Sequence, residues 1–147
     1  APSEFSINLQ SASYPILPLV AQESGTLGNF DLVFQRPSAY TGTPAYFNSS
    51  RLVFDYTGTY PGIYAMHYEN VGDNYGATVP VTAIFGQDEG TEGLSEGSDG
   101  TVQPARTAAL QGFFACNVTL GGDEYLGLRF GVPMVDGRRR RGVFSLR

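Results

Sequence analysis

The segment Phe5-Ser6-Ile7-Asn8-Leu9 alternates apolar and polar side chains with a period of two residues. This alternation is typical of a β-strand that has one face in the core and the other in water. Similar runs, rich in β-branched and aromatic residues, recur at residues 30–34, 52–56, 63–68, 78–85, 112–118, 125–130 and 142–146. The chain is therefore predicted to consist of β-strands.

Glycine and proline separate these runs. The 147 residues include 19 Gly and nine Pro, and Pro61-Gly62, Gly121-Gly122 and Asp136-Gly137 are turn signals. No segment has apolar residues at the i, i+3, i+4, i+7 spacing of an amphipathic helix, and residues 105–110 allow a turn or two at most. We expect one all-β domain over residues 1–147, an antiparallel β-sandwich or partly closed barrel of eight to ten short strands.

Residues 86–101 interrupt the strand pattern with five acidic residues, five glycines and almost nothing to bury. This composition predicts a flexible, solvated loop. Ca²⁺ prefers oxygen ligands, and the candidate ligands in this segment are the carboxylates of Asp88, Glu89, Glu92, Glu96 and Asp99. Their spacing differs from that of an EF-hand loop, so we expect a solvated loop and no metal or other cofactor.

Several features predict secretion. The chain begins Ala1-Pro2-Ser3, a start that signal peptidase leaves after small residues, and the sequons Asn48-Ser49-Ser50 and Asn117-Val118-Thr119 offer Asn48 and Asn117 for glycosylation. Cys116 has no second cysteine to pair with and is expected to be a buried thiol. No apolar run approaches the roughly 18 residues of a membrane span. We expect a secreted glycoprotein that is extracellular or in a cell wall.

Charge is distributed unevenly. Residues 1–137 hold all fourteen acidic residues but only four of the nine arginines, a balance of −10, and the chain has no lysine. An acidic body repels phosphate backbones, so nucleic acid is not an expected partner. The run Arg138, Arg139, Arg140 and Arg141 has two interpretations. It is a dibasic processing site or electrostatic contact, or it leads from a turn at Asp136-Gly137 into a basic C-terminal strand within residues 138–147.

Seven tyrosines lie between residues 40 and 75. Aromatic rings stack on sugar rings, which makes a candidate glycan-binding surface of Tyr56, Tyr60, Tyr64, Tyr68 and Tyr75. Tyrosine is also common on ordinary sheet faces, where the ring is buried and the hydroxyl wet, and this alternative stays open.

No catalytic motif stands out. His67 is the single histidine, and the metalloprotease, nucleophile-elbow and phosphate-loop motifs are absent. A glycosidase needs two carboxyl groups about 5–10 Å apart, and the spacing of the candidates singles out no pair among Asp55, Glu69, Asp73, Asp123 and Glu124. No catalytic residue is assigned, and a non-catalytic role is favoured.

Four segments carry a family resemblance: residues 5–9, the stretch Tyr46-Phe47-Asn48-Ser49-Ser50, the strand ending Ala115-Cys116-Asn117, and residues 125–130 with Leu128-Arg129-Phe130. In this order they resemble a group of small secreted fungal proteins that share a domain of unknown function. The resemblance implies a secreted fungal β-protein and transfers no catalytic residue. The family pattern includes further cysteines near the C-terminus, where this chain has the arginine run.

These observations favour a non-catalytic secreted or cell-wall-associated protein that acts through its surface, by binding glycan or protein or by self-association. Self-association would bring the arginine run of one copy onto the acidic loop of another. The alternatives are a polysaccharide hydrolase that uses an Asp/Glu pair and a secreted effector that inhibits a host protein.

Overall fold

The computed structural model describes residues 3–11, 14–23, 29–34, 42–58, 60–69, 78–98, 100–104, 112–120, 122–131 and 143–146. Within these ranges the chain forms strands and turns and no helix, which confirms the all-β prediction. The strands are β1 (Ile7–Ser11), β2 (Tyr14–Glu23), β3 (Asn29–Phe34), β4 (Ala45–Asn48), β5 (Arg51–Tyr56), β6 (Gly62–His67), β7 (Thr78–Pro80), β8 (Thr82–Phe85), β9 (Ser95–Glu96), β10 (Val102–Gln103), β11 (Gly112–Leu120), β12 (Asp123–Gly131) and β13 (Val143–Leu146).

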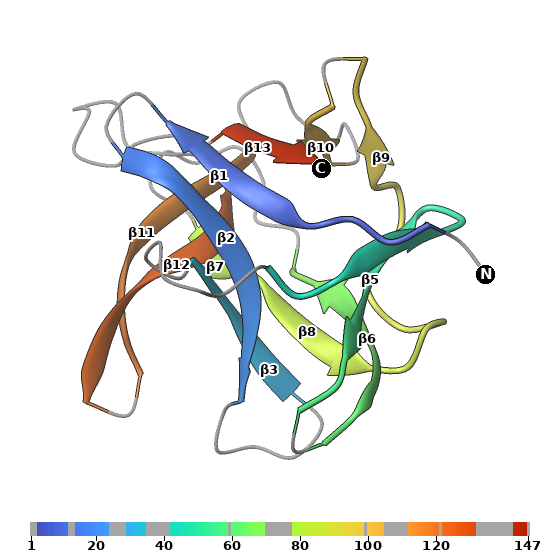
Figure 1. The fold of residues 1–147 in the computed structure, drawn as a ribbon, viewed down its shortest axis with the longest axis horizontal. Helices are drawn as coiled ribbons and strands as arrows, with labels where there is room; N and C mark the ends of the chain where they lie inside the picture. Colours follow the sequence, from blue (N-terminus) through green and yellow to red (C-terminus); the bar gives the residue numbers. More distant parts are fainter. Residues whose placement is uncertain are drawn as a thin grey trace.

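One antiparallel sheet curls almost into a closed barrel (Figure 1). Its strands follow the order β13-β1-β2-β3-β8-β6-β5-β4. The gap between β4 and the start of β1 is bridged by two hydrogen bonds of 2.8 Å, in which the backbone N–H groups of Phe5 and Ala45 each donate to the carbonyl of the other residue. The partly closed barrel is thus the correct member of the two expected architectures.

A long β11–β12 hairpin branches from the barrel at β3. Leu126 and Gly127 of β12 pair with Phe34 and Val33, whereas the first residues of β3 pair with β8. The run 78–85, expected as one strand, is divided at Val81, whose backbone N–H donates to the Leu128 carbonyl at 3.2 Å. The division arises because β7 pairs with β12 while β8 pairs with β3 and β6.

Strand β2 was not anticipated from its sequence, because Pro18 interrupts the alternation and proline is rare inside a sheet. The ladder between β2 and β3 begins at Leu19, directly after Pro18, and runs to Glu23. The N–H group that proline lacks therefore costs no hydrogen bond to β3. The fold accommodates Pro18 at the point where the pairing to β3 begins.

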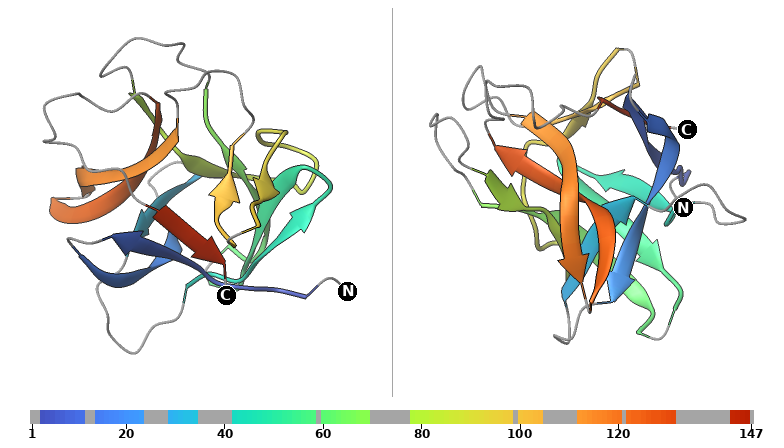
Figure 2. Two further views of the ribbon diagram at one scale, coloured as in Figure 1. Left: turned by 90° about the horizontal axis from the view of Figure 1, so that it is seen from above. Right: turned by 90° about the vertical axis from the view of Figure 1, so that its left-hand side faces the viewer.

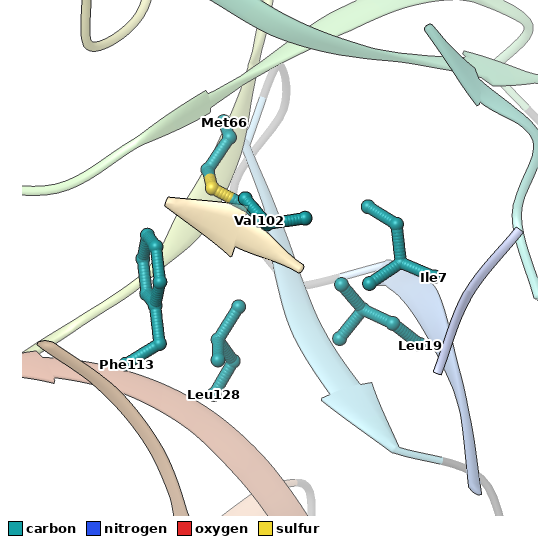
Figure 3. Close-up of a pocket in the computed structure, with 6 residues that line it drawn as sticks. All are labelled: Ile7, Leu19, Met66, Val102, Phe113 and Leu128. Carbon is teal, nitrogen blue, oxygen red and sulfur yellow. The ribbon is translucent and has the colours of Figure 1, made fainter. Parts of the chain in front are cut away.

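Side chains fill the barrel interior. Figure 3 shows six apolar side chains from β1, β2, β6, β10, β11 and β12 that point toward one another, namely Ile7, Leu19, Met66, Val102, Phe113 and Leu128. The cavity that they leave is about 10 Å³, at the lower limit for a single water molecule. This part of the interior is a packed core and does not hold a ligand chamber.

We call residues 86–101 the acidic segment, of which Asp99 lies outside the described residues. The described part of this segment is attached to the barrel. The backbone N–H groups of Thr91 and Leu94 donate to the carbonyls of Met66 at 2.9 Å and Ser50 at 2.8 Å. The Leu94 side chain is only 2% exposed and packs in the core. The expectation of a solvated loop with almost nothing to bury is corrected: the segment buries Leu94 in the core and is hydrogen-bonded to the barrel.

Gly90 shows why the acidic segment contains glycine. A Cβ atom there would lie 2.6 Å from the Met66 carbonyl oxygen and 2.7 Å from the Ala65 Cβ, and the backbone φ angle is 93°. The close approach and the left-handed conformation both require glycine. Gly90 therefore lets the acidic segment pack tightly against β6, whereas the glycine content alone had predicted a flexible segment.

The acidic segment contains β9 and is followed directly by β10, and the small β9–β10 hairpin lies over one end of the barrel when the molecule is viewed from above (Figure 2). Val102 of this hairpin contributes to the core cavity. This end of the barrel is therefore covered.

Strand β13 lies in the segment expected to form the C-terminal strand and pairs with β1, from Ile7↔Leu146 to Gln10↔Val143. The run Arg138–Arg141 lies outside the described residues. None of the described residues forms a helix with the length and apolarity to cross a membrane.

Candidate aromatic binding surface

Five aromatic residues belong to the barrel end where β3 and β6 begin and β5 and β8 end, which lies opposite the β9–β10 hairpin in Figure 1. We call this cluster the aromatic end, and it consists of Phe30, Tyr56, Tyr60, Tyr64 and Phe85. The register explains how it forms: Tyr64 pairs with Phe54 on β5 and with Phe85 on β8. Antiparallel pairing thus brings residues from distant parts of the chain to one place.

The inner layer of the aromatic end is rigidly packed. Phe30 and Tyr64 are 2% and 3% exposed and stack with their ring centroids 4.2 Å apart. Tyr56 meets Phe30 edge-on at 4.5 Å, and Phe85 meets Tyr64 edge-on at 5.3 Å. Such contacts fix the orientation of each ring by its neighbours.

The outer layer presents two rings to solvent. Phe85 is 60% exposed and Tyr60 is 51% exposed, and among the described residues these are the exposed large hydrophobic side chains. The backbone that carries Tyr60 lies near Phe85, because the Phe85 ring lies across Gly62, two residues after Tyr60. Exposed aromatic residues on neighbouring segments are a candidate binding surface.

Two glycines make room for this arrangement. A Cβ atom at Gly62 would lie 2.8 Å from Cε1 of Phe85, so the Phe85 ring lies across Gly62, and the Tyr56 hydroxyl lies in the same way against Gly58. The Tyr64 hydroxyl donates a hydrogen bond of 2.8 Å to the Tyr60 carbonyl. The β5–β6 connection that carries Tyr60 is thereby held in place by three aromatic side chains.

An acidic turn directly follows Phe85. Gln87, Asp88 and Glu89 are exposed, and the Glu89 N–H donates to the Gly86 carbonyl at 3.3 Å. The Asn48 amide Nδ2 donates to the Gln87 carbonyl at 2.9 Å and connects this turn to the β4–β5 hairpin. The backbone of the turn that follows Phe85 is therefore fixed in position.

The structure brings together three of the five tyrosines that the sequence proposed for glycan contact, Tyr56, Tyr60 and Tyr64. Tyr68 is 8% exposed and packs against Phe113 and Phe130 at 5.4 and 4.2 Å, and burial raises its pKa to about 12. The buried rings of Tyr64 and Tyr68 offer no face to a ligand, and Tyr75 lies outside the described residues. Sequence reasoning missed Phe30 and Phe85, because it followed tyrosine density and had no strand register.

The candidate carboxyl groups are dispersed. Asp55 forms a hydrogen bond with Glu4 that raises the pKa of the exposed Glu4, a residue that the sequence had not singled out. Glu69 Oε1 lies 3.3 Å from His67 Nε2 at the surface. Asp123 and Glu124 are exposed on the β11–β12 hairpin, and Asp73 lies outside the described residues. Within the described ranges no three His, Cys, Asp or Glu side chains are grouped to hold a metal ion.

Both sequons lie at the surface. Asn117 is exposed on β11, together with Thr119 of the same sequon. Asn48 is half-buried beside the β4–β5 turn, where Ser49 has a φ angle of 56°. Cys116 is half-buried and forms no disulfide.

Comparisons of the chain with protein-family models, with curated proteins and with solved structures find no match. The functional argument for the aromatic end therefore depends on its geometry and chemistry.

Proposed function

We propose that this chain is a secreted or cell-wall-associated, non-catalytic protein that binds glycan through the aromatic end. The observation that carries the proposal is the pair of exposed rings, Phe85 and Tyr60, supported by a buried layer of stacked aromatics. The Phe85 ring packs edge-on against Tyr64 and therefore loses little conformational entropy when a ligand covers it, which favours binding.

The size of the surface favours a glycan over a protein partner. A stable protein–protein interface buries about 800 Å² on each partner. A single sugar ring, in contrast, covers one aromatic side chain with its C–H face, so two exposed rings provide contacts for two sugar units. Secretion is supported by the exposed sequon at Asn117.

The geometry gives less support to a hydrolase. The hydrogen bond with Asp55 that raises the pKa of Glu4 indicates that these two carboxyl groups are in contact. Glycosidases need about 5 Å or more between their two carboxyl groups, so that a sugar or a water molecule fits between them. Glu4 directly precedes Phe5 of the Phe5–Ala45 bridge.

The proposal is tested by measuring binding of the full chain to a panel of glycans and insoluble cell-wall fractions. Phe85→Ala and Tyr60→Ala should each weaken binding about tenfold, corresponding to about 1.4 kcal/mol for the loss of one contact ring. Tyr125→Ala, which removes a half-buried tyrosine on β12, is the matched control and should bind as the unaltered protein does.

Melting temperatures of the three variants show whether each one is folded. A double variant of Phe85 and Tyr60 that is folded and keeps full affinity would refute glycan binding at the aromatic end. If the unaltered protein binds no glycan and instead forms concentration-dependent oligomers that the double variant abolishes, the surface serves self-association and the proposal is wrong.

A further inference from the structure

We infer that the glycan taken by the aromatic end is a cationic amino-sugar polymer, in which free amino groups contact the acidic turn next to Phe85. This inference rests on the proposed function and adds the chemical class of the ligand. Two parts of the surface carry it, the exposed ring of Phe85 and the acidic side chains of Asp88 and Glu89.

The acidic turn follows Phe85 directly in the chain, and backbone hydrogen bonds fix its position. Gly86 follows Phe85 directly, and its N–H donates to the Ile63 carbonyl at 2.9 Å, which extends the pairing between β6 and β8 by one residue. The side chain of Glu89 folds back over Gly86, since a Cβ atom at Gly86 would lie 2.9 Å from Cγ of Glu89. The Glu89 carboxyl group is thus held beside the residue that follows the exposed ring.

The arginines of the described residues do not neutralise this turn. Arg51 pairs with Glu92 at 2.8 Å, and Arg129 donates to the hydroxyl and carbonyl of Thr78 at 3.2 and 3.3 Å. Residues 1–137 as a whole hold fourteen acidic residues and four arginines. The described residues hold eleven acidic residues and two arginines, so these residues by themselves favour cations over anions at the turn.

These two elements together match an amino sugar. The C–H face of a glucosamine ring stacks on Phe85, while its ammonium group lies near Asp88 or Glu89. An N-acetylated sugar keeps the stacking face but has no positive charge. A uronic acid polymer also keeps a ring face, but its carboxylates are repelled by the turn.

The experiment measures calorimetric binding of the full chain to three soluble oligosaccharides of equal length: a β-linked glucosamine oligomer, its fully N-acetylated counterpart and an oligogalacturonate. We expect the glucosamine oligomer to bind most tightly, the N-acetylated form more weakly and the galacturonate least. Affinity for the glucosamine oligomer should fall several-fold as salt is raised, because surface charges are screened.

Variants locate the charge effect. Asp88→Asn with Glu89→Gln should weaken binding of the glucosamine oligomer about two- to tenfold, since exposed charge pairs contribute modestly, and should leave the N-acetylated oligomer unaffected. Asp123→Asn with Glu124→Gln is the matched control, with the same change in charge on the exposed β11–β12 hairpin. It should retain the affinity of the unaltered chain for all three ligands.

The results distinguish this inference from the proposed function. Equal affinity for the charged and N-acetylated oligomers, with dependence on Phe85 retained, would overturn the charge inference while the proposed function stands. Equal losses in the two double variants would also overturn it, because the effect would then come from net charge and not from the acidic turn. Absence of binding to every glycan would refute the proposed function itself.

Discussion

Leu94→Ala tests whether the acidic segment is a structural part of the barrel. The side chain of Leu94 is 2% exposed in the core, and its backbone N–H donates to the Ser50 carbonyl at 2.8 Å. If the segment is docked as described, truncation of this one side chain should destabilise the whole domain. If the segment is a solvated loop, the truncation should have almost no effect.

The expected magnitude has two parts. Removing three buried carbon atoms costs about 2.4 kcal/mol, at about 0.8 kcal/mol for each methylene-sized group. An uncollapsed cavity of about 80 Å³ would add about 2 kcal/mol, at roughly 24 cal/mol per Å³. The segment is connected through a short hairpin and can partly close the gap, so we expect a total loss of about 3 kcal/mol. For a domain of this size the melting temperature then falls by about 10 °C.

Urea denaturation and thermal melting, both followed by circular dichroism, measure this loss. Ser95→Ala is the matched control, because Ser95 is the exposed neighbour of Leu94 and its substitution should change stability by no more than about 0.5 kcal/mol. A loss below about 1 kcal/mol for Leu94→Ala, similar to that of the control, would refute the docking of the segment through this side chain.

Three further predictions follow from local features. Gly90→Ala should lower the free energy of unfolding by about 2–4 kcal/mol, because a Cβ atom would lie 2.6 Å from the Met66 carbonyl oxygen. The control Gly100→Ala, at a positive φ of 82° with no atom within 4 Å, should cost only about 1–2 kcal/mol. Equal losses of stability in urea denaturation would contradict the close packing at Gly90. The pKa values of Glu4 and Asp31 are raised from 4.5 and 3.8, by the hydrogen bond to Asp55 and by desolvation respectively, so folding favours their protonated forms and stability decreases as the pH rises above about 4. Asp31→Asn should therefore raise the melting temperature at pH 7 and flatten its pH profile, whereas Glu4→Gln, at an exposed and solvent-screened site, should change both only slightly. An unchanged profile in Asp31→Asn would count against the assignment. Ultraviolet titration should show a tyrosine step near the raised Tyr68 pKa of about 12, and Tyr68→Phe should remove it; a step that persists in the variant would show that another tyrosine is responsible.

The strands were predictable to different degrees, for reasons visible in their residues. β3 and β5 are short runs with many inward-facing apolar side chains, and sequence alternation found them within one residue of their ends. β2 was missed because it carries Pro18, and β9 and β10 were missed because two residues each give no periodic signal. The break at Val81 arises because β7 pairs with β12 whereas β8 pairs with β3. Both partner strands are remote in the chain, so the local sequence gives no sign of the break.

The candidate site was partly predictable. Tyrosine enrichment indicated Tyr56, Tyr60 and Tyr64, and the turn signal Pro61-Gly62 separates Tyr60 from the strand run that holds Tyr64, but the sequence does not show which face of that strand is buried. The difference in exposure between Tyr60 and Tyr64 arises because Tyr64 faces into the barrel between Phe54 and Phe85 in the register, whereas Tyr60 lies in the turn before β6. The acidic residues were recognised as a group, yet their role next to Phe85 depends on how the segment turns at Gly86.

The sequence by itself determined the all-β class and the acidic character of residues 1–137, because strand alternation and charge are local or additive properties of the chain. Only the tertiary structure decided that the sheet closes through Phe5 and Ala45, that Leu94 brings the acidic segment onto the core, and that Phe85 meets Tyr64 at one end of the barrel. The physical reason is that these three contacts join residues far apart in the sequence. Such contacts are set by strand register and packing of the whole domain, which no single segment encodes.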